Sequence, residues 1–117
     1  MSPELKRGDV VVVDLEPIKG SETGKTRPCV VIQNDIGNKY SPVTIVAVIT
    51  GQKEISKQYP TDVWISKGDG GLNKDSIVQC DQIRTITKER IQANIGHFNP
   101  NIMKDVNKAL KISLSLF

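Results

Sequence analysis

The chain has 117 residues, enough for one hydrophobic core, so a single domain over residues 1–117 is expected. Its Lys and Arg residues outnumber its Asp and Glu residues by 16 to 13, an excess that permits contact with a polyanion but does not establish one. No apolar run approaches the roughly 18 residues of a membrane span, and the start lacks the apolar segment of a secretion signal, so a soluble, cytoplasmic protein is expected.

The first half of the chain is typical of β-structure. Residues 10–15 begin with four valines and predict a strand that is buried on both faces. Residues 16–26 contain proline and three glycines or serines and predict a surface loop, long enough to suspect a function. Strands are then expected at 27–34 and 43–50, joined by turn signals in residues 35–42, so these two strands can form a hairpin.

The second half is expected to add a polar loop at 51–60, strands at 61–66, 76–83 and 95–98, and a helical turn at 87–91. Asn99 and Pro100 are a good N-cap and first residue of a helix, and the apolar residues that follow recur every three or four positions. These elements predict an α+β domain: a mainly antiparallel, SH3-like small barrel or curled sheet with a C-terminal amphipathic helix.

Two common functional sites are disfavoured by the sequence. Residues 20–26, GSETGKT, are one residue short of the phosphate-binding pattern GxxxxGKS/T, and Pro28 disfavours the helix that would have to continue through Arg27. His97 is the only histidine, so a nuclease that uses one histidine as base and another as acid cannot be built within one chain. The aspartates are scattered, mostly among turn signals, and we predict neither a catalytic metal nor a cofactor.

Cys29 and Cys80 lie far apart in the sequence, each in an apolar run and without the CxxC spacing of a redox or metal site. Buried free thiols are therefore expected rather than a disulfide.

Arg27 and Thr50 are the candidate chemical pair. If the strands at 27–34 and 43–50 pair end to end, Arg27 lies opposite Thr50 and both side chains share one face of the sheet. A guanidinium can bind phosphate oxygens in a bidentate way, and a hydroxyl can add a further hydrogen bond to the same group. On residue types alone, a surface arginine packed beside a threonine at a strand end is the favoured interpretation.

The chain resembles the MazF/PemK family of toxin endoribonucleases. The resemblance extends over nearly the whole chain and is carried by two long segments and four short ones, namely KTRPCVVIQND at 25–35, IVAVIT at 45–50, KRGDV at 6–10, GSE at 20–22, DS at 75–76 and QIRTI at 82–86. It implies a fold shared with the toxin CcdB, a homodimer, and cleavage of single-stranded RNA at short sequences. The family's catalytic arginine and threonine fall on Arg27 and Thr50, the pair that the hairpin already suggested.

The same resemblance implies a reaction and a set of contacts. The ribose 2′-hydroxyl would attack the adjacent phosphate, leaving a 2′,3′-cyclic phosphate and a 5′-hydroxyl end, with Arg27 stabilising the charge that develops. Contacts with RNA bases are expected from two residues of the first loop and from three further residues: Ser21, Glu22, Asn34, Tyr59 and Gln82. The expected protein partner is an antitoxin of the MazE type, whose acidic tail covers the RNA site.

Two other classes of function remain as alternatives. An inhibitor of the CcdB kind would bind a topoisomerase through a terminal Trp-Gly-Ile motif, whereas this chain ends in Leu-Ser-Leu-Phe and has its only tryptophan at Trp64. A general nucleic-acid-binding module would need several exposed aromatic residues or a dense basic stripe. The chain has only two Tyr, two Phe and one Trp, so the endoribonuclease is favoured.

Overall fold

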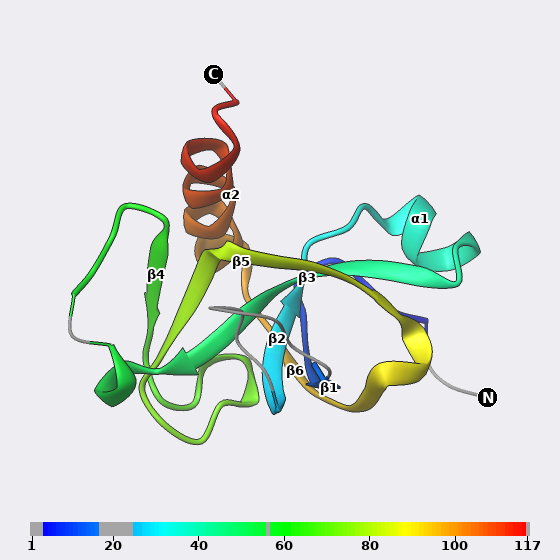
Figure 1. Cartoon of the computed structure of the whole chain (residues 1–117), viewed down its shortest axis with the longest axis horizontal. Coiled ribbons are helices and arrows are strands. Elements are labelled where there is room, and N and C mark those ends of the chain that lie inside the picture. Colours follow the sequence, from blue (N-terminus) through cyan, green and yellow to red (C-terminus); the bar gives the residue numbers. More distant parts are fainter. Residues whose placement is uncertain (1–3, 17–24, 56, 117) are drawn as a thin grey trace.

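The computed structural model describes residues 4–16, 25–55 and 57–116, which form one antiparallel sheet and a long C-terminal helix (Figure 1). The strands and helices, in chain order, are β1 (Asp9–Asp14), β2 (Thr26–Val31), α1 (Asp35–Tyr40), β3 (Val43–Gly51), β4 (Asp62–Ile65), β5 (Ser76–Thr87), β6 (Ile91–His97) and α2 (Pro100–Leu114). Three short 3-10 helices complete them: η1 (Gln52–Glu54), η2 (Asp69–Gly71) and η3 (Lys88–Arg90). None of the helices described is long and apolar enough to cross a membrane.

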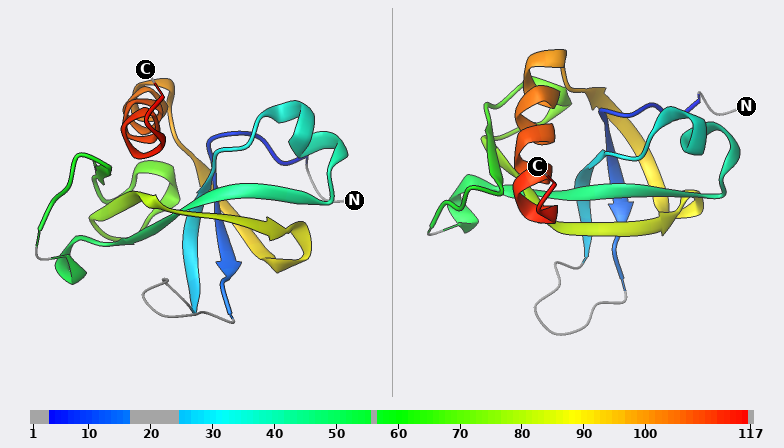
Figure 2. Two further views of the ribbon diagram at one scale, coloured as in Figure 1. Left: turned by 45° about the horizontal axis from the view of Figure 1, so that its top comes forward. Right: turned by 90° about the horizontal axis from the view of Figure 1, so that it is seen from above.

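The six strands follow the order β4-β5-β3-β2-β1-β6, and every neighbouring pair is antiparallel. The ends of this order, β4 and β6, are not paired with each other, so the sheet is curled rather than closed into a barrel (Figure 2). A register shift between Ala47 and Val48 of β3 bends the long strand β5, since extra residues on one strand kink it and increase its twist. The predicted α+β class and curled sheet are confirmed.

The two faces of the sheet carry two separate hydrophobic clusters. Successive residues of a strand point to opposite faces, and in β1 Val10 packs under α2 while Val11 and Val13 pack on the other face. All three are fully buried, as expected for a strand with no polar alternation. Cys29 and Cys80 are also buried and carry free thiols, one in each cluster, as the sequence predicted.

Helix α2 closes one face of the sheet. The Asn99 side chain accepts a hydrogen bond of 2.9 Å from the Ile102 backbone N–H, and Pro100 follows at the first helical position. The residues that face the sheet are Met103, Val106 and Ala109, spaced by three residues each. The predicted N-cap and amphipathic face of this helix are confirmed.

Some predicted boundaries were wrong. Residues 35–42 were expected to form a turn, but residues 35–40 form α1, because the Asn34 side chain caps a helical turn by accepting from the Gly37 N–H at 2.8 Å. The strand expected at 27–34 ends at Val31, the strand expected at 76–83 continues to Thr87, and the edge strand begins at Ile91 instead of residue 95. The helical turn expected at 87–91 is present as η3.

A close backbone approach joins η2 to β6. A Cβ on Gly71 would lie 1.9 Å from the Ile95 carbonyl oxygen, and Gly71 also has a φ of +77°. Gly68, in the same turn, has a φ of +99° but open space around the position of its Cβ. Alanine substitutions at these two positions therefore distinguish the energetic cost of a positive φ, present at both, from the cost of a steric collision, present only at Gly71.

We expect Gly68→Ala to lower the free energy of unfolding by about 1–2 kcal/mol, the usual cost of a positive φ for a residue with a Cβ. Gly71→Ala should cost more than about 3 kcal/mol, since it adds a collision with backbone that cannot rotate away. Urea unfolding followed by circular dichroism measures both. Equal losses for the two variants would contradict the close approach of η2 to β6.

Burial raises the pKa of each thiol, Cys29 and Cys80, to about 12. The reactive form of cysteine is the thiolate, so we expect neither thiol of the native protein to react with Ellman's reagent at about pH 8. In guanidinium chloride, where the burial is lost, both thiols should react at once. Rapid labelling of the native protein would show that one of the two hydrophobic clusters opens readily.

Candidate active site

The hairpin of β2 and β3 brings Arg27 to Thr50. The two strands pair with Cys29 opposite Val48 and Val31 opposite Val46, and the same register continued by two residues sets Arg27 opposite Thr50. The Arg27 Nη1 atom donates a hydrogen bond of 3.1 Å to Thr50 Oγ1. The register assumed from the sequence is therefore the register of the structure, and the two side chains meet as predicted.

Local structure fixes both side chains in place. Pro28 favours an extended backbone at Arg27, and Arg27 continues the antiparallel pairing of β2 with β1, where it lies opposite Val13. Thr50 is near the end of β3 and only 6% exposed, so its hydroxyl needs hydrogen-bond partners within the protein. Arg27 supplies a donor to that hydroxyl, and its own side chain is partly exposed to solvent.

Glu54 completes the group. It is the last residue of η1, which starts directly after β3 and turns the chain back towards Thr50. Its Oε2 atom accepts from Thr50 Oγ1 at 2.5 Å and from Arg27 Nη1 at 3.0 Å. The sequence did not single out Glu54, which lay in the polar loop expected at 51–60.

The charges around Glu54 favour its ionised form. The hydrogen bond from Thr50 is the main reason that the pKa of Glu54 lies below its ordinary value, and the hydrogen bond and positive charge of Arg27 act in the same direction. Lys74 adds a smaller effect. Its ammonium lies against the Gly51 backbone, 3.0 Å from where a Cβ would be. Two cations, one hydroxyl and one carboxylate thus gather at this end of the sheet.

Two polar atoms near this group have no hydrogen-bond partner among the residues described. They are Arg27 Nε and Gln79 Oε1, and both atoms are buried. Gln79 lies opposite Val48, two residues before Thr50, so it is on the same sheet face as Arg27 and Thr50. Gln79 was not predicted from the sequence, where only its position in an expected strand was visible.

The predicted RNA-binding residues are more dispersed. Ser21 and Glu22 lie outside the described residues. Asn34 lies beyond the far end of β2 from Arg27, and its side chain caps α1. Gln82 is half-buried in the stretch of β5 where the pairing with β3 shifts register.

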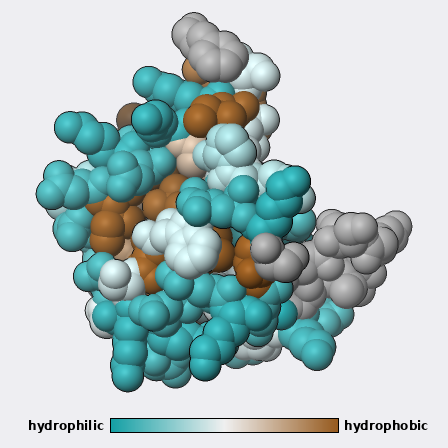
Figure 3. Space-filling view, turned by 90° about the vertical axis from the view of Figure 1, so that its left-hand side faces the viewer, coloured by the Kyte–Doolittle hydropathy of each residue, from teal (hydrophilic) through white to brown (hydrophobic). Residues whose placement is uncertain are grey.

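Tyr59 lies beside the edge strand β4, on the face of the sheet that α2 covers. Its ring is 52% exposed and has the Lys57 ammonium 5.6 Å from its centroid. Together with Trp64 and Ile112 it lines a groove of about 430 Å³ between β4 and α2. Figure 3, which looks at this side of the molecule, shows hydrophobic residues gathered between hydrophilic ones. Trp64 is 46% exposed.

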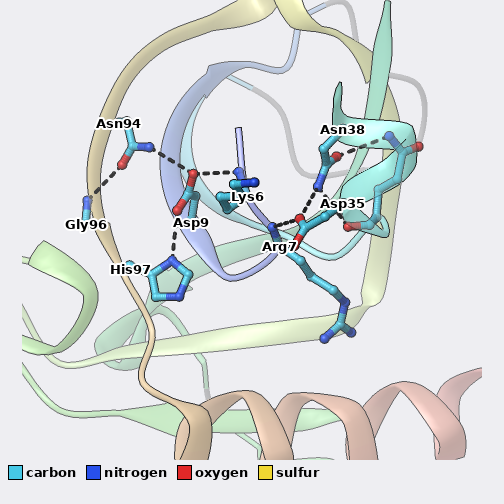
Figure 4. Close-up of polar contacts among 9 residues, drawn as sticks. Lys6, Arg7, Asp9, Asp35, Asn38, Asn94, Gly96 and His97 are labelled. Carbon is cyan, nitrogen blue, oxygen red and sulfur yellow. Dashed lines mark hydrogen bonds and ion pairs between the residues drawn. The ribbon is translucent and has the colours of Figure 1, made fainter. Parts of the chain in front are cut away.

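A second polar cluster lies at the start of β1, at the opposite end of that strand from Val13, which pairs with Arg27. Asp9 accepts from the Lys6 backbone N–H at 2.9 Å and from Asn94 Nδ2 at 3.1 Å, and its Oδ1 lies 2.8 Å from His97 Nδ1 (Figure 4). These contacts tie the N-terminal segment to β6. His97 is the last residue of the edge strand β6 and belongs to this structural cluster.

Among residues 4–16, 25–55 and 57–116, no group of three or more His, Cys, Asp or Glu side chains is arranged to hold a metal ion. The cluster of Asp9 and His97 has only two such residues. At the end of the β2–β3 hairpin, Arg27 and Thr50 are donors suited to an anion, and the carboxylate of Glu54 accepts from both.

Comparison with known proteins identifies the family. The family model of PemK-like, MazF-like toxins of type II toxin-antitoxin systems matches residues 6–114. The Endoribonuclease MazF of Staphylococcus saprophyticus is 49% identical over 112 residues, which cover 96% of this chain and 92% of that protein.

Solved structures show the same fold. MazF from Deinococcus radiodurans superposes with a TM-score of 0.83 at 19% identity, covering 98% of this chain and all of that chain. A mycobacterial endoribonuclease in complex with its cognate antitoxin gives a TM-score of 0.80 at 24% identity, with 97% of each chain covered. On the family match and the staphylococcal relative together, the chain belongs to the PemK-like, MazF-like toxins of type II toxin-antitoxin systems.

Proposed function

We propose that this chain is an endoribonuclease that cuts single-stranded RNA at specific short sequences, without a metal ion, as the toxin of a type II toxin-antitoxin system. The observation that carries the proposal is the contact of 3.1 Å between the Arg27 guanidinium and the Thr50 hydroxyl. Family membership and the staphylococcal relative support RNA as the substrate.

The proposed reaction starts with attack of the ribose 2′-hydroxyl on the adjacent phosphorus. The bond from phosphorus to the 5′-oxygen breaks, which leaves a 2′,3′-cyclic phosphate on one fragment and a 5′-hydroxyl on the other. Arg27 would stabilise the negative charge that develops on the phosphorane oxygens, and Thr50 would donate a hydrogen bond to the same group. Arginine stays protonated at any physiological pH, so Arg27 acts by charge and we assign proton transfer to neither residue.

We assign base contacts to the residues expected from the family resemblance: Ser21, Glu22, Tyr59, Gln82 and Asn34. The exposed ring of Tyr59 can stack on an unpaired base, because every base offers a π-face. Gln82 can read a base edge through its amide. Asn34 would contact RNA only by giving up its hydrogen bond to the first turn of α1.

We also propose two protein partners. One is a second copy of the chain, in a homodimer, and the other is a MazE-type antitoxin with an acidic segment that covers the site. The mycobacterial relative was solved with its cognate antitoxin, and a MazE-MazF complex is known from Deinococcus radiodurans. Two cations, Arg27 and Lys74, lie where an acidic segment would compete with RNA. Both partners and the RNA substrate would be met in the cytoplasm.

Arg27→Ala and Thr50→Ala should each lower the rate of RNA cleavage, by about 10²–10³-fold or more, as for the loss of one transition-state donor. The assay follows a long unstructured RNA in the presence of EDTA, together with DNA of the same sequence. We expect discrete RNA fragments with 5′-hydroxyl ends from the unaltered protein and intact DNA throughout, because DNA lacks the 2′-hydroxyl.

Lys104→Ala and Thr85→Ala are the matched controls for these variants. Both residues are exposed and lie outside the candidate site, on α2 and β5. Each control removes the same charge or hydroxyl as its partner variant and should cleave like the unaltered protein. RNA that stays intact with the unaltered protein would favour a toxin that acts by binding a topoisomerase, as CcdB does.

A further inference from the structure

The Glu54 carboxylate occupies the anion position of the candidate site. One oxygen, Oε2, accepts from both Arg27 and Thr50, the two groups proposed to bind the scissile phosphate. The Glu54 side chain is 47% exposed, whereas Thr50 is nearly buried, so the carboxylate lies at the mouth of the site and covers its donors. A phosphate oxygen at the same point would accept the same two hydrogen bonds.

A phosphodiester and this carboxylate cannot share the position. The Thr50 hydroxyl has a single proton to donate, and in this arrangement that proton is directed at Glu54. Two anions at hydrogen-bond distance from one guanidinium also repel each other. The phosphate can therefore take both donors only if the Glu54 side chain leaves.

We infer that Glu54 is a resident substitute for the scissile phosphate: it orders Arg27 and Thr50 in the free protein, and single-stranded RNA binds by displacing it. The inference rests on the proposed endoribonuclease function and adds a residue to it. Glu54 is a positioning residue in this account. It competes with the phosphodiester for the same donors and takes no part in bond breaking.

The structure allows this displacement at low cost to the fold. Gln52, at the start of η1, anchors the segment through its Nε2 atom to the carbonyl oxygens of Ile65 and Ser76, at 3.3 and 3.2 Å. Glu54 itself lies outside the strand ladders and holds the site only through its side chain. Rotation of that side chain into solvent breaks no hydrogen bond of the sheet.

A role for Glu54 as the base that activates the 2′-hydroxyl fits less well. A general base works best when its pKa is near the working pH, whereas the pKa of Glu54 is lowered, first by the bond from Thr50. The charged groups that act on it are Arg27 from β2 and Lys74 from the segment before β5. Both are cations, which favour the carboxylate as a bound anion.

The test measures binding of a fully 2′-O-methylated RNA oligonucleotide, which cannot be cut, by fluorescence anisotropy. Glu54→Gln and Glu54→Ala should each bind it about tenfold more tightly than the unaltered protein at neutral pH, and their kcat/KM on cleavable RNA should rise by a similar factor. Glu89→Gln is the matched control, because Glu89 is exposed on η3 and its change adds the same net charge. It should alter binding by no more than about twofold.

The pH profile separates displacement from a structural role. Because the pKa of Glu54 lies below its ordinary value, protonation removes the competitor only as the pH falls below about 4, where the unaltered protein should bind more tightly relative to Glu54→Gln. Equal affinities of Glu54→Gln and Glu89→Gln, or a large loss of kcat in Glu54→Gln, would overturn the inference. The proposed function would still stand in that case, provided that the unaltered protein cleaves RNA. If the unaltered protein neither binds nor cuts RNA, the proposed function fails and the inference fails with it.

Discussion

The antiparallel ladder between β2 and β3 is the constraint on which the candidate site depends. A slip of one residue in this ladder would turn Arg27 to the opposite face from Thr50, because successive residues of a strand alternate between faces. The two hydrophobic clusters prevent that slip. Val30 is fully buried under α2 and Val31 is fully buried on the other face, so a shifted register would exchange the surroundings of both. The core thus fixes the geometry of the polar pair at the strand end.

Much of this frame could be predicted from the sequence. The valine run of β1, the two strands of equal expected length and the Asn99 cap are local patterns, and local patterns specify strands, hairpins and helix starts directly. The Arg27–Thr50 pair could be predicted because the strand register was assumed from the lengths of the two strands, which requires no knowledge of distant contacts. Family resemblance then gave the same two residues a chemical role, which still awaits the cleavage assay.

The features that escaped prediction depend on tertiary contacts. Residues 35–42 contain Gly37 and Asn38, which favour a turn locally, yet Asn38 is buried and bound from several directions: its Oδ1 accepts from Thr44 Oγ1 at 2.7 Å and from Gln33 Nε2 at 3.1 Å. These partners stabilise α1 against the local preference. Glu54 was missed for a similar reason. Nothing in its neighbours marks it, and its position depends on where η1 leaves β3.

A site that binds an anion has to hold its donors before the anion arrives. Without a partner, the nearly buried Thr50 hydroxyl would lose hydrogen bonds, and the Arg27 guanidinium would be free to adopt many rotamers. Water can satisfy such donors but gives little order, whereas a carboxylate on the same chain orders both at once. The order is obtained at the expense of affinity, since every arriving phosphate must displace the carboxylate. A carboxylate on a half-exposed, three-residue helix is a balance between these demands: close enough to order the donors, and loosely enough attached to leave.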